Sequence, residues 1–241
     1  VTFNSASAQT IYKPSGETFN NMVFNGSGTK TLLSAITATN ITINSGALLD
    51  VNTTNNQITL KTAFTNNGTF YARKGLVLLN GTTAQSITGA STTSFYDLTL
   101  TNNAGATLGH AQSLMNTLTL SNGTFNTNSQ VFTMLSNATR TARIAQITGT
   151  GNIIGNVTVQ RFVPGGYTGW ALLGSPISST LTLQDWDDDI VISCPTCPDG
   201  TAAGFNSVYW YDETKPGLFD AVASYIPLTA ITNPILPNRG Y

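Results

Sequence analysis

One acidic turn near the C-terminus has the residue types and spacing of a metal site. Asp185, Asp187 and Asp189 alternate within the stretch Asp-Trp-Asp-Asp-Asp. Alternating carboxylates on a turn can converge on a hard cation, and Ca²⁺ accepts about six to eight oxygens with flexible geometry. The glycine and the distal glutamate of an EF-hand loop are missing here. Two interpretations stay open: a calcium site formed by the three aspartates or, which we favour, an exposed acidic turn with Trp186 buried beside it.

The only two cysteines, Cys194 and Cys197, are separated by two residues. A redox-active pair of this spacing normally begins a helix that follows a buried strand. These two lie instead in a loop-like Cys-Pro-Thr-Cys-Pro-Asp-Gly stretch without helical periodicity. We therefore expect a local structural disulfide, with a pair of reduced thiols as the alternative. Zinc is disfavoured because the sole histidine, His110, is too distant in the sequence to complete a ligand set.

Carboxylates that could cleave polysaccharides are scarce in the first 150 residues, which contain only Glu17, Asp50 and Asp97. Glycoside hydrolysis normally needs two carboxylates about 5–10 Å apart. Asp50 and Asp97 occupy non-equivalent positions of the repeat described below, so we interpret them as isolated turn or surface carboxylates. His110, next to a glycine, is interpreted as a loop residue. No Gly-x-Ser-x-Gly elbow, phosphate loop or histidine pair for a metal occurs, and we expect no enzymatic activity and no organic cofactor.

The composition is unusually poor in charge. Charged residues make up 9% of the 241 residues, against about 25% in typical soluble domains. The net charge of −1 suggests no basic surface for phosphates or anionic lipids, so we expect no nucleic-acid binding. No apolar run approaches the roughly 18 residues of a membrane-spanning helix, and we expect no transmembrane segment.

An internal duplication organises the first part of the chain. Asn4–Ile11 returns as Asn80–Ile87, and Phe19–Phe24 returns as Phe95–Leu100, both 76 residues later. Each copy contains short elements in which two apolar residues flank a third, usually polar residue, which places both apolar side chains on one face of a strand. The clearest are Val1/Phe3, Met22/Phe24, Ile41/Ile43, Ile58/Leu60, Val77/Leu79, Leu98/Leu100 and Leu118/Leu120. Their spacing predicts four turns of about 19 residues in each copy.

A turn of that length buries its few apolar residues only by stacking on its neighbours. The sequence thus predicts an all-β protein with a parallel β-helix, or solenoid, over residues 1–160. We expect hydrogen-bonded ladders between like Asn and Thr side chains, and corners with positive φ at the Asn-Gly pairs that begin at Asn25, Asn67, Asn80 and Asn122. We also expect one inward ladder formed by Phe3, Phe24, Ile43, Leu60, Leu79, Leu100 and Leu120. The alternative, an antiparallel sandwich with hairpin turns, does not explain the long repeat.

Beyond about residue 156 the pattern changes. All three tryptophans and eight of the 11 acidic residues lie in this last part. The short strand patterns Ala171–Leu173 and Val208–Tyr211, with many turn signals between them, predict part of an antiparallel β-sandwich over residues 161–241. Val1 begins directly on a repeat position, and Arg239–Tyr241 looks like the start of another strand. We therefore expect further coils before this segment and further strands after it.

The junction resembles a known type of secreted protein. Ile153–Pro164, followed by Trp170–Pro176, is similar to a segment common in large secreted proteins of Bacteroidetes, where Asn/Thr/Gly-rich β-helix repeats precede it and a β-sandwich follows. Val208–Asp212 and Arg239–Tyr241 also resemble the sandwich part. The resemblance implies export to the cell surface by the type IX secretion system, although this chain shows no C-terminal sorting domain. It supplies no catalytic residues.

The expected function is that of a non-catalytic structural or adhesive protein outside the cell, in which a stiff repeat spacer presents the sandwich. One alternative is a carbohydrate-binding module that stacks sugars on exposed aromatics. Tyr167, Trp170, Tyr209 and Tyr211 are its candidates, and the competing interpretation places them in the sandwich core. A polysaccharide-degrading β-helix enzyme is the other alternative. The partners we expect are the type IX secretion machinery, other surface proteins, glycans, and further copies joined through the solenoid ends.

Overall fold

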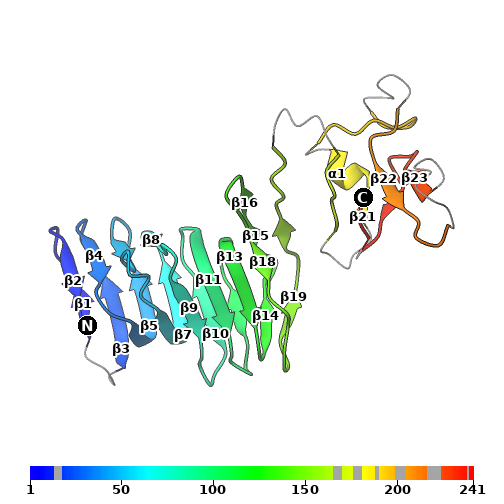
Figure 1. Cartoon of the computed structure of the whole chain (residues 1–241). Coiled ribbons are helices and arrows are strands. Elements are labelled where there is room, and N and C mark those ends of the chain that lie inside the picture. The colour runs from blue at the N-terminus through cyan, green and yellow to red at the C-terminus, as the bar shows by residue number, and fades with distance from the viewer. Residues whose placement is uncertain are drawn as a thin grey trace. The chain divides into compact units, whose positions relative to one another are not determined.

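The computed structural model describes residues 1–13, 18–164, 170–175, 181–187, 190–198, 205–215, 224–237 and 239–241. Contacts between residues divide the chain into two units, Val1–Gly165 and Gly166–Tyr241. The first unit is a parallel β-solenoid of about seven turns. Figure 1 shows its strands stacked in sequence order, from blue at β1 to green at β19. The predicted all-β class and parallel solenoid are confirmed.

Each turn of the solenoid visits three rows of parallel strands, which we number in the order first met along the chain. Row 1 contains β1 (Thr2–Phe3), β3 (Phe19–Phe24), the second halves of β5 (Ile36–Ile43) and β7 (Ile58–Asn66), β10 (Gln85–Thr88), β12 (Ala106–Leu108), β14 (Thr124–Asn126) and β19 (Asn152–Ile154).

Row 2 contains β2 (Gln9–Ile11), β4 (Thr29–Leu32), β6 (Leu48–Asp50) and β8 (Thr69–Tyr71), then the first halves of β11 (Thr93–Leu100) and β13 (Gln112–Leu120), β15 (Phe132–Met134) and β20 (Thr158–Val159). Strand pairing in this row is interrupted between β8 and β11, where the rings of Phe70 and Phe95 lie 6.2 Å apart.

Row 3 contains the first halves of β5 and β7, β9 (Leu76–Leu79), the second halves of β11 and β13, and β18 (Arg143–Ile144). Between β15 and β18 the chain forms a short antiparallel hairpin from β16 (Ser136–Asn137) and β17 (Arg140–Thr141).

The expected single inward ladder is wrong in its register. Phe3, Phe24 and Ile43 stack in row 1, where the next partner of Ile43 is Asn66. Leu60 instead stacks on Ala38, and it is followed in row 3 by Leu79, Leu100 and Leu120. The step from Ile43 to Leu60 passes from one row to another because β7 bends and contributes to both. All members of the two ladders are buried except Phe3, which is half-buried.

The long repeat is likewise not a whole number of turns. Gln9 accepts a hydrogen bond from the Ser5 backbone N at 3.1 Å, and Gln85 accepts the equivalent bond from Gly81 at 2.9 Å. Gln9 lies in row 2 and Gln85 in row 1, so the same corner recurs three turns and two rows further on. Regular turns have 19 to 23 residues, which corrects the expected four turns of about 19.

Polar ladders between turns form as predicted. Asn40 Nδ2 donates to Asn21 Oδ1 at 2.8 Å, and Asn44 donates in the same way to Asn25. Hydroxyl pairs do the same at Ser94 and Ser113, whose oxygens lie 2.7 Å apart. Since each bond joins residues about one turn apart, the outward Asn, Ser and Thr residues fasten neighbouring turns together.

Only two of the four Asn-Gly corners have the positive φ that we expected. Gly26 and Gly123 have φ of 70° and 82°, whereas φ is not positive at Gly68 and Gly81. A Cβ at Gly81 would lie 2.1 Å from the Lys61 carbonyl oxygen of the preceding turn. Glycine is needed at that corner because the two backbones approach closely, rather than for its φ.

Lys30 is a fully buried cation inside the second turn. Its Nζ donates to the carbonyl oxygens of Ser5 at 2.9 Å, Gly26 at 2.8 Å and Gly28 at 2.6 Å. Burial lowers the pKa of this ammonium group. The side chain occupies the row 2 position that Leu49 takes in the next turn. In the second turn a hydrogen-bonded ammonium group therefore stands where the next turn has an apolar core residue.

We expect Lys30→Met to lower the free energy of unfolding by about 2 kcal/mol, because three backbone acceptors lose their donor. Lys61→Met is the matched control. The Lys61 ammonium donates to the Asn80 carbonyl oxygen at 3.1 Å and to Asn80 Oδ1 at 2.5 Å from a half-buried position. Its loss should cost less than about 1 kcal/mol. Urea unfolding followed by circular dichroism measures both, and equal losses would contradict the special role of Lys30.

The second unit contains antiparallel strand pairs and one short helix. β21 (Leu181–Thr182) pairs with β24 (Pro234–Ile235), and β22 (Tyr209–Tyr211) pairs with β23 (Tyr225–Pro227). α1 spans Gln184–Asp187. A separate core consists of Leu183, Ile192, Cys194, Cys197, Val208, Leu228, Ile235 and Tyr241. The antiparallel pairing agrees with the sequence, and the strand predicted at Val208–Tyr211 forms as β22. The strand predicted at Ala171–Leu173 does not form, although Leu173 exchanges two backbone hydrogen bonds of 2.8 Å with Tyr241. The sandwich itself stays a prediction. Within the described ranges, no helix is long and apolar enough to span a bilayer.

Candidate functional site

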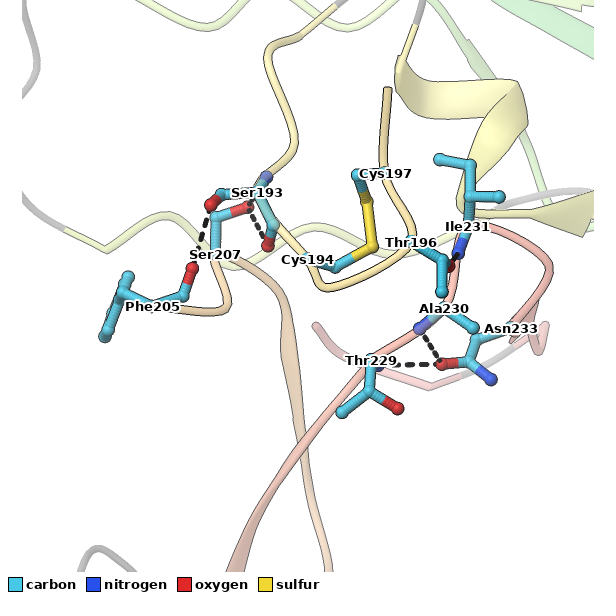
Figure 2. Close-up of a disulfide and its surroundings, with 10 residues drawn as sticks. All are labelled: Ser193, Cys194, Thr196, Cys197, Phe205, Ser207, Thr229, Ala230, Ile231 and Asn233. Atoms are coloured by element: carbon cyan, nitrogen blue, oxygen red, sulfur yellow. Dashed lines mark hydrogen bonds between the residues drawn. A yellow bond between two sulfur atoms is a disulfide. The ribbon is translucent and has the colours of Figure 1, made fainter. Parts of the chain in front are cut away.

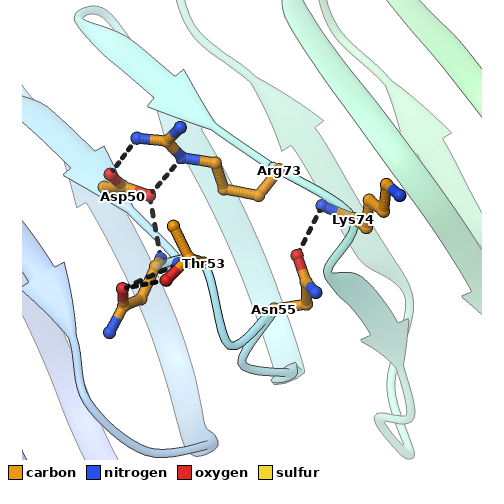
Figure 3. A network of polar contacts seen from close by, with 6 residues as sticks. Asp50, Thr53, Asn55, Arg73 and Lys74 are labelled. Atoms are coloured by element: carbon orange, nitrogen blue, oxygen red, sulfur yellow. Dashed lines mark hydrogen bonds and ion pairs between the residues drawn. The ribbon is translucent and has the colours of Figure 1, made fainter.

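One polar cluster of the solenoid joins two successive corners. Asp50 ends β6, and Arg73 follows β8 in a left-handed conformation with φ of 48°. Arg73 Nε donates to Asp50 Oδ1 at 3.0 Å and its Nη2 donates to Oδ2 at 2.7 Å, while the Asn52 backbone N donates to Oδ1 at 2.8 Å (Figure 3). A further hydrogen bond connects the same two corners, because the Lys74 backbone N donates to Asn55 Oδ1 at 3.0 Å.

The Arg73 hydrogen bonds lower the pKa of Asp50 against the opposing effect of burial. A carboxylate held ionised in this way is a poor general acid. Its two oxygens are both used to join turns. Asp50 and Arg73 therefore form a structural clamp whose arginine remains half exposed to solvent, with 45% of its side chain accessible.

This clamp makes the stability of the solenoid depend on pH. The folded-state pKa of Asp50 lies below the value of about 3.9 in an unfolded chain. The stabilisation is thus present at neutral pH and disappears as the pH falls through the folded-state pKa. Asp50→Asn should melt at a lower temperature than the wild type at pH 7, and the difference should shrink below about pH 4. Melting curves at pH 7 and pH 3 measure this, and a constant difference would contradict it.

The other solenoid candidates also have structural partners. Asp97 lies at the bulge of β11, and its Oδ1 accepts from Asn116 Nδ2 at 2.7 Å and from the Thr117 backbone N at 3.0 Å. His110 Nδ1 lies 3.2 Å from the Ala111 carbonyl oxygen in the corner before β13. Glu17 falls outside the described residues. Asp50 and Asp97 each connect neighbouring turns, which agrees with their interpretation as isolated carboxylates.

The acidic turn is described for two of its three predicted ligands. Asp185 Oδ2 accepts from the Thr182 backbone N at 2.7 Å and from Thr182 Oγ1 at 3.0 Å, and these hydrogen bonds lower the pKa of Asp185. Asp187 Oδ1 is buried without a hydrogen-bond partner. Asp189 lies outside the described residues. Trp186 is half-buried against the core of the unit. Over the ranges that the structure covers, no group of three or more His, Cys, Asp or Glu is placed to hold a metal ion, and calcium stays a prediction.

The two cysteines form a disulfide inside the second unit. Cys194 and Cys197 are both buried, and their Cα atoms lie 5.0 Å apart. Figure 2 shows the loop around them held at one side by Thr196, whose Oγ1 accepts a hydrogen bond from the Ile231 backbone N at 3.0 Å. The disulfide thus belongs to the core of this unit. Redox-active cysteines are partly exposed to solvent, so the burial of both residues favours a structural role.

We expect no free thiol when the unreduced protein is denatured and titrated with a thiol reagent. After reduction, the second unit should lose stability, because its core contains both sulfur atoms and the closed loop restricts the unfolded chain. The loop is short, so we expect a loss of about 2 kcal/mol or less. Detection of two thiols before reduction would contradict the disulfide.

An aromatic cluster, Trp170, Phe205 and Tyr209, lies on the second unit. The Trp170 ring centroid is 5.7 Å from that of Phe205 and 5.6 Å from that of Tyr209. Trp170 is 67% exposed, and Tyr211 is also exposed. These side chains therefore do not fill the core, as one interpretation of the sequence supposed. Tyr167, the fourth predicted aromatic, lies outside the described residues.

Comparisons with protein-family models, with curated proteins and with solved structures found no match to this chain. Sequence reasoning missed Arg73 as the partner of Asp50. The spacing of the two residues could have indicated this pair. Their opposite charges lie 23 residues apart, which is about one turn of the solenoid, and few other charged residues occur nearby in the sequence.

Proposed function

We propose that the protein is a non-catalytic structural or adhesive protein outside the cell, in which a stiff spacer is joined to a binding unit. The observation that carries the proposal is the continuous core of the solenoid. Its apolar side chains stack through successive turns, and the carboxylates Asp50 and Asp97 serve to join turns. A parallel stack advances about 4.8 Å per turn, so added turns lengthen such a spacer without changing its cross-section.

The same proposal includes delivery to the cell surface by type IX secretion, with surface proteins, glycans or further copies as partners. A buried disulfide supports an oxidising compartment, because disulfides persist outside the cytosol. The low charge and the resemblance of the junction to secreted Bacteroidetes proteins support the same location.

Surface labelling tests the location directly. Antiserum raised against the chain should label intact cells that produce it, and labelling only after lysis would contradict the proposal. Catalysis is tested by incubating the full chain with a panel of polysaccharides and assaying new reducing ends. Product formation above a heat-denatured control would replace the proposed function with the enzymatic alternative.

A carbohydrate-binding role is the second candidate, and the exposure of Trp170 favours it. Aromatic rings that remain in solvent offer flat apolar faces on which sugar rings stack. A glycan array probed with the full chain should then show bound glycans that are lost in Trp170→Ala. Tyr12→Ala is the control, since Tyr12 is an exposed aromatic of the solenoid unit and contacts none of the candidate aromatics. An array without signal would exclude this role.

A further inference from the structure

The balanced net charge hides a basic solenoid. Residues 1–165 contain eight of the ten Lys and Arg residues but only three of the 11 acidic residues. The solenoid unit thus has a formal charge of +5, and the second unit has −6. The expectation that the chain has no basic surface is therefore wrong for the solenoid, because it averaged two units of opposite charge.

Several of these cations line a hollow on the surface of the solenoid, where strand pairing in row 2 is interrupted. The hollow is shallow and open to solvent, and it is lined by Phe70, Tyr71, Ala72, Arg73, Ser94, Met115 and Arg140. A second hollow shares two of these residues and is lined by Thr53, Asn55, Arg73, Lys74 and Arg140. We call this continuous surface the basic groove, defined by Thr53, Asn55, Tyr71, Arg73, Lys74 and Arg140.

Arg140 enters the groove from the hairpin β16–β17, far along the chain from Arg73. Its guanidinium lies 5.6 Å from the centre of the Tyr96 ring, and its Nη1 lies 3.9 Å from Met115 Sδ. The hairpin turn is fixed by Asn137 Oδ1, which accepts from the Arg140 backbone N at 3.1 Å. Among the described residues, no carboxylate lies within 4.0 Å of the Arg140 guanidinium. The ion pair beside the groove is formed by Arg73 and Asp50 instead. Arg140 is thus a positioned cation with an unneutralised charge.

Arg73 and Lys74 supply the other side of the groove. Arg73 lies 5.6 Å from the Tyr71 ring centre and is oriented by its two bonds to Asp50, which leave Nη1 outside the ion pair. Lys74 is fixed at its backbone by Asn55 (Figure 3), and its ammonium has no carboxylate partner in the part of the chain that the structure covers. Tyr71 is 48% exposed beside them.

We propose that the basic groove binds an acidic polysaccharide. Guanidinium and ammonium groups bind carboxylate or sulfate by charge-assisted hydrogen bonds. Thr53 and Asn55 offer neutral groups for sugar hydroxyls, and Tyr71 offers a ring edge and face for apolar sugar carbons. A nucleic acid fits less well, because proteins that bind it contact about 6–10 phosphates, whereas this groove has three cations and one of them is shared with Asp50.

The basic groove belongs to the solenoid unit, whereas the aromatic cluster belongs to the second unit. It deepens the proposed adhesive function by naming a ligand class, but surface labelling tests that function independently. Carboxylated and sulfated polymers share the required chemistry, so the experiment includes both.

The experiment measures binding of the full chain to immobilised polygalacturonate and dextran sulfate by biolayer interferometry. Neutral dextran and a single-stranded oligonucleotide are the comparison ligands. The double variant Lys74→Gln with Arg140→Gln should weaken binding to at least one acidic polymer by about tenfold or more, because two charge-assisted contacts are lost. The polymer that binds identifies carboxylate or sulfate as the recognised group. Neutral dextran should not bind.

The matched control removes the same charge elsewhere, by Lys13→Gln with Lys215→Gln, and should change binding less than about twofold, since neither residue lines the groove. Tyr71→Ala should weaken binding, whereas Trp170→Ala should leave it unchanged. Melting curves show whether each variant is folded. Absence of binding to both acidic polymers, equal losses in the two double variants, or tighter binding of the oligonucleotide would overturn the proposal.

Discussion

Replacing Phe64 with aspartate is expected to unfold the solenoid. Phe64 is fully buried on β7, and its ring centroid lies 5.3 Å from that of Phe70 and 5.7 Å from that of Phe95. Truncating a buried phenylalanine costs about 3–5 kcal/mol, and an unpaired buried charge adds several kcal/mol. Since domains are stable by only about 5–15 kcal/mol, the variant should lose the cooperative unfolding transition of the solenoid in circular dichroism.

Thr65→Asp is the control for the Phe64 variant. Thr65 is the next residue of the same strand and points outward, where its Oγ1 lies 3.1 Å from Thr88 Oγ1. A carboxylate there stays hydrated, so the expected loss is about 1 kcal/mol or less. Similar destabilisation by both substitutions would show that the inward and outward faces of β7 are assigned incorrectly.

Gly123→Ala is expected to destabilise the solenoid by about 3 kcal/mol or more, because it combines backbone strain with a collision between turns. Gly123 has a φ of 82°, and a Cβ there would lie 1.9 Å from the Asn102 carbonyl oxygen. Asn102 is itself held in place, since its Nδ2 donates to the Thr83 carbonyl oxygen at 2.6 Å and to Gln85 Oε1 at 3.1 Å. The neighbouring corner therefore cannot easily move aside.

Gly46→Ala separates the strain from the collision. Gly46 has a similar φ of 79°, but a Cβ there would meet no atom within 4 Å. Its substitution should cost only the strain of the left-handed conformation, about 1 kcal/mol. Urea unfolding of both variants gives the difference, and equal losses would mean that close packing between corners does not limit the solenoid.

The local features of the candidate sites were predictable where they depend on short spacing. Cys194 and Cys197 are close enough in sequence for a disulfide whatever the surrounding fold, and the structure joins them. The basic groove was not predictable, because it combines Arg73 with Arg140. Residues 67 positions apart meet there only because stacked turns and an irregular hairpin bring them to the same hollow.

The sequence by itself determined that the first unit is a stack of parallel turns and which side chains face inward. Alternation with a period of two fixes the inward and outward sides of a strand, and the long repeat requires stacking. Only the tertiary structure decided which row each strand joins. β5, β7, β11 and β13 bend and continue from one row into the next, with a bulge in the pairing of β5 with β7 and of β11 with β13. Alternation carries no information about such bends, because a residue can face the core from any of the three rows. The position of a corner depends on close contacts with the turns before and after it, which form only when the stack is complete.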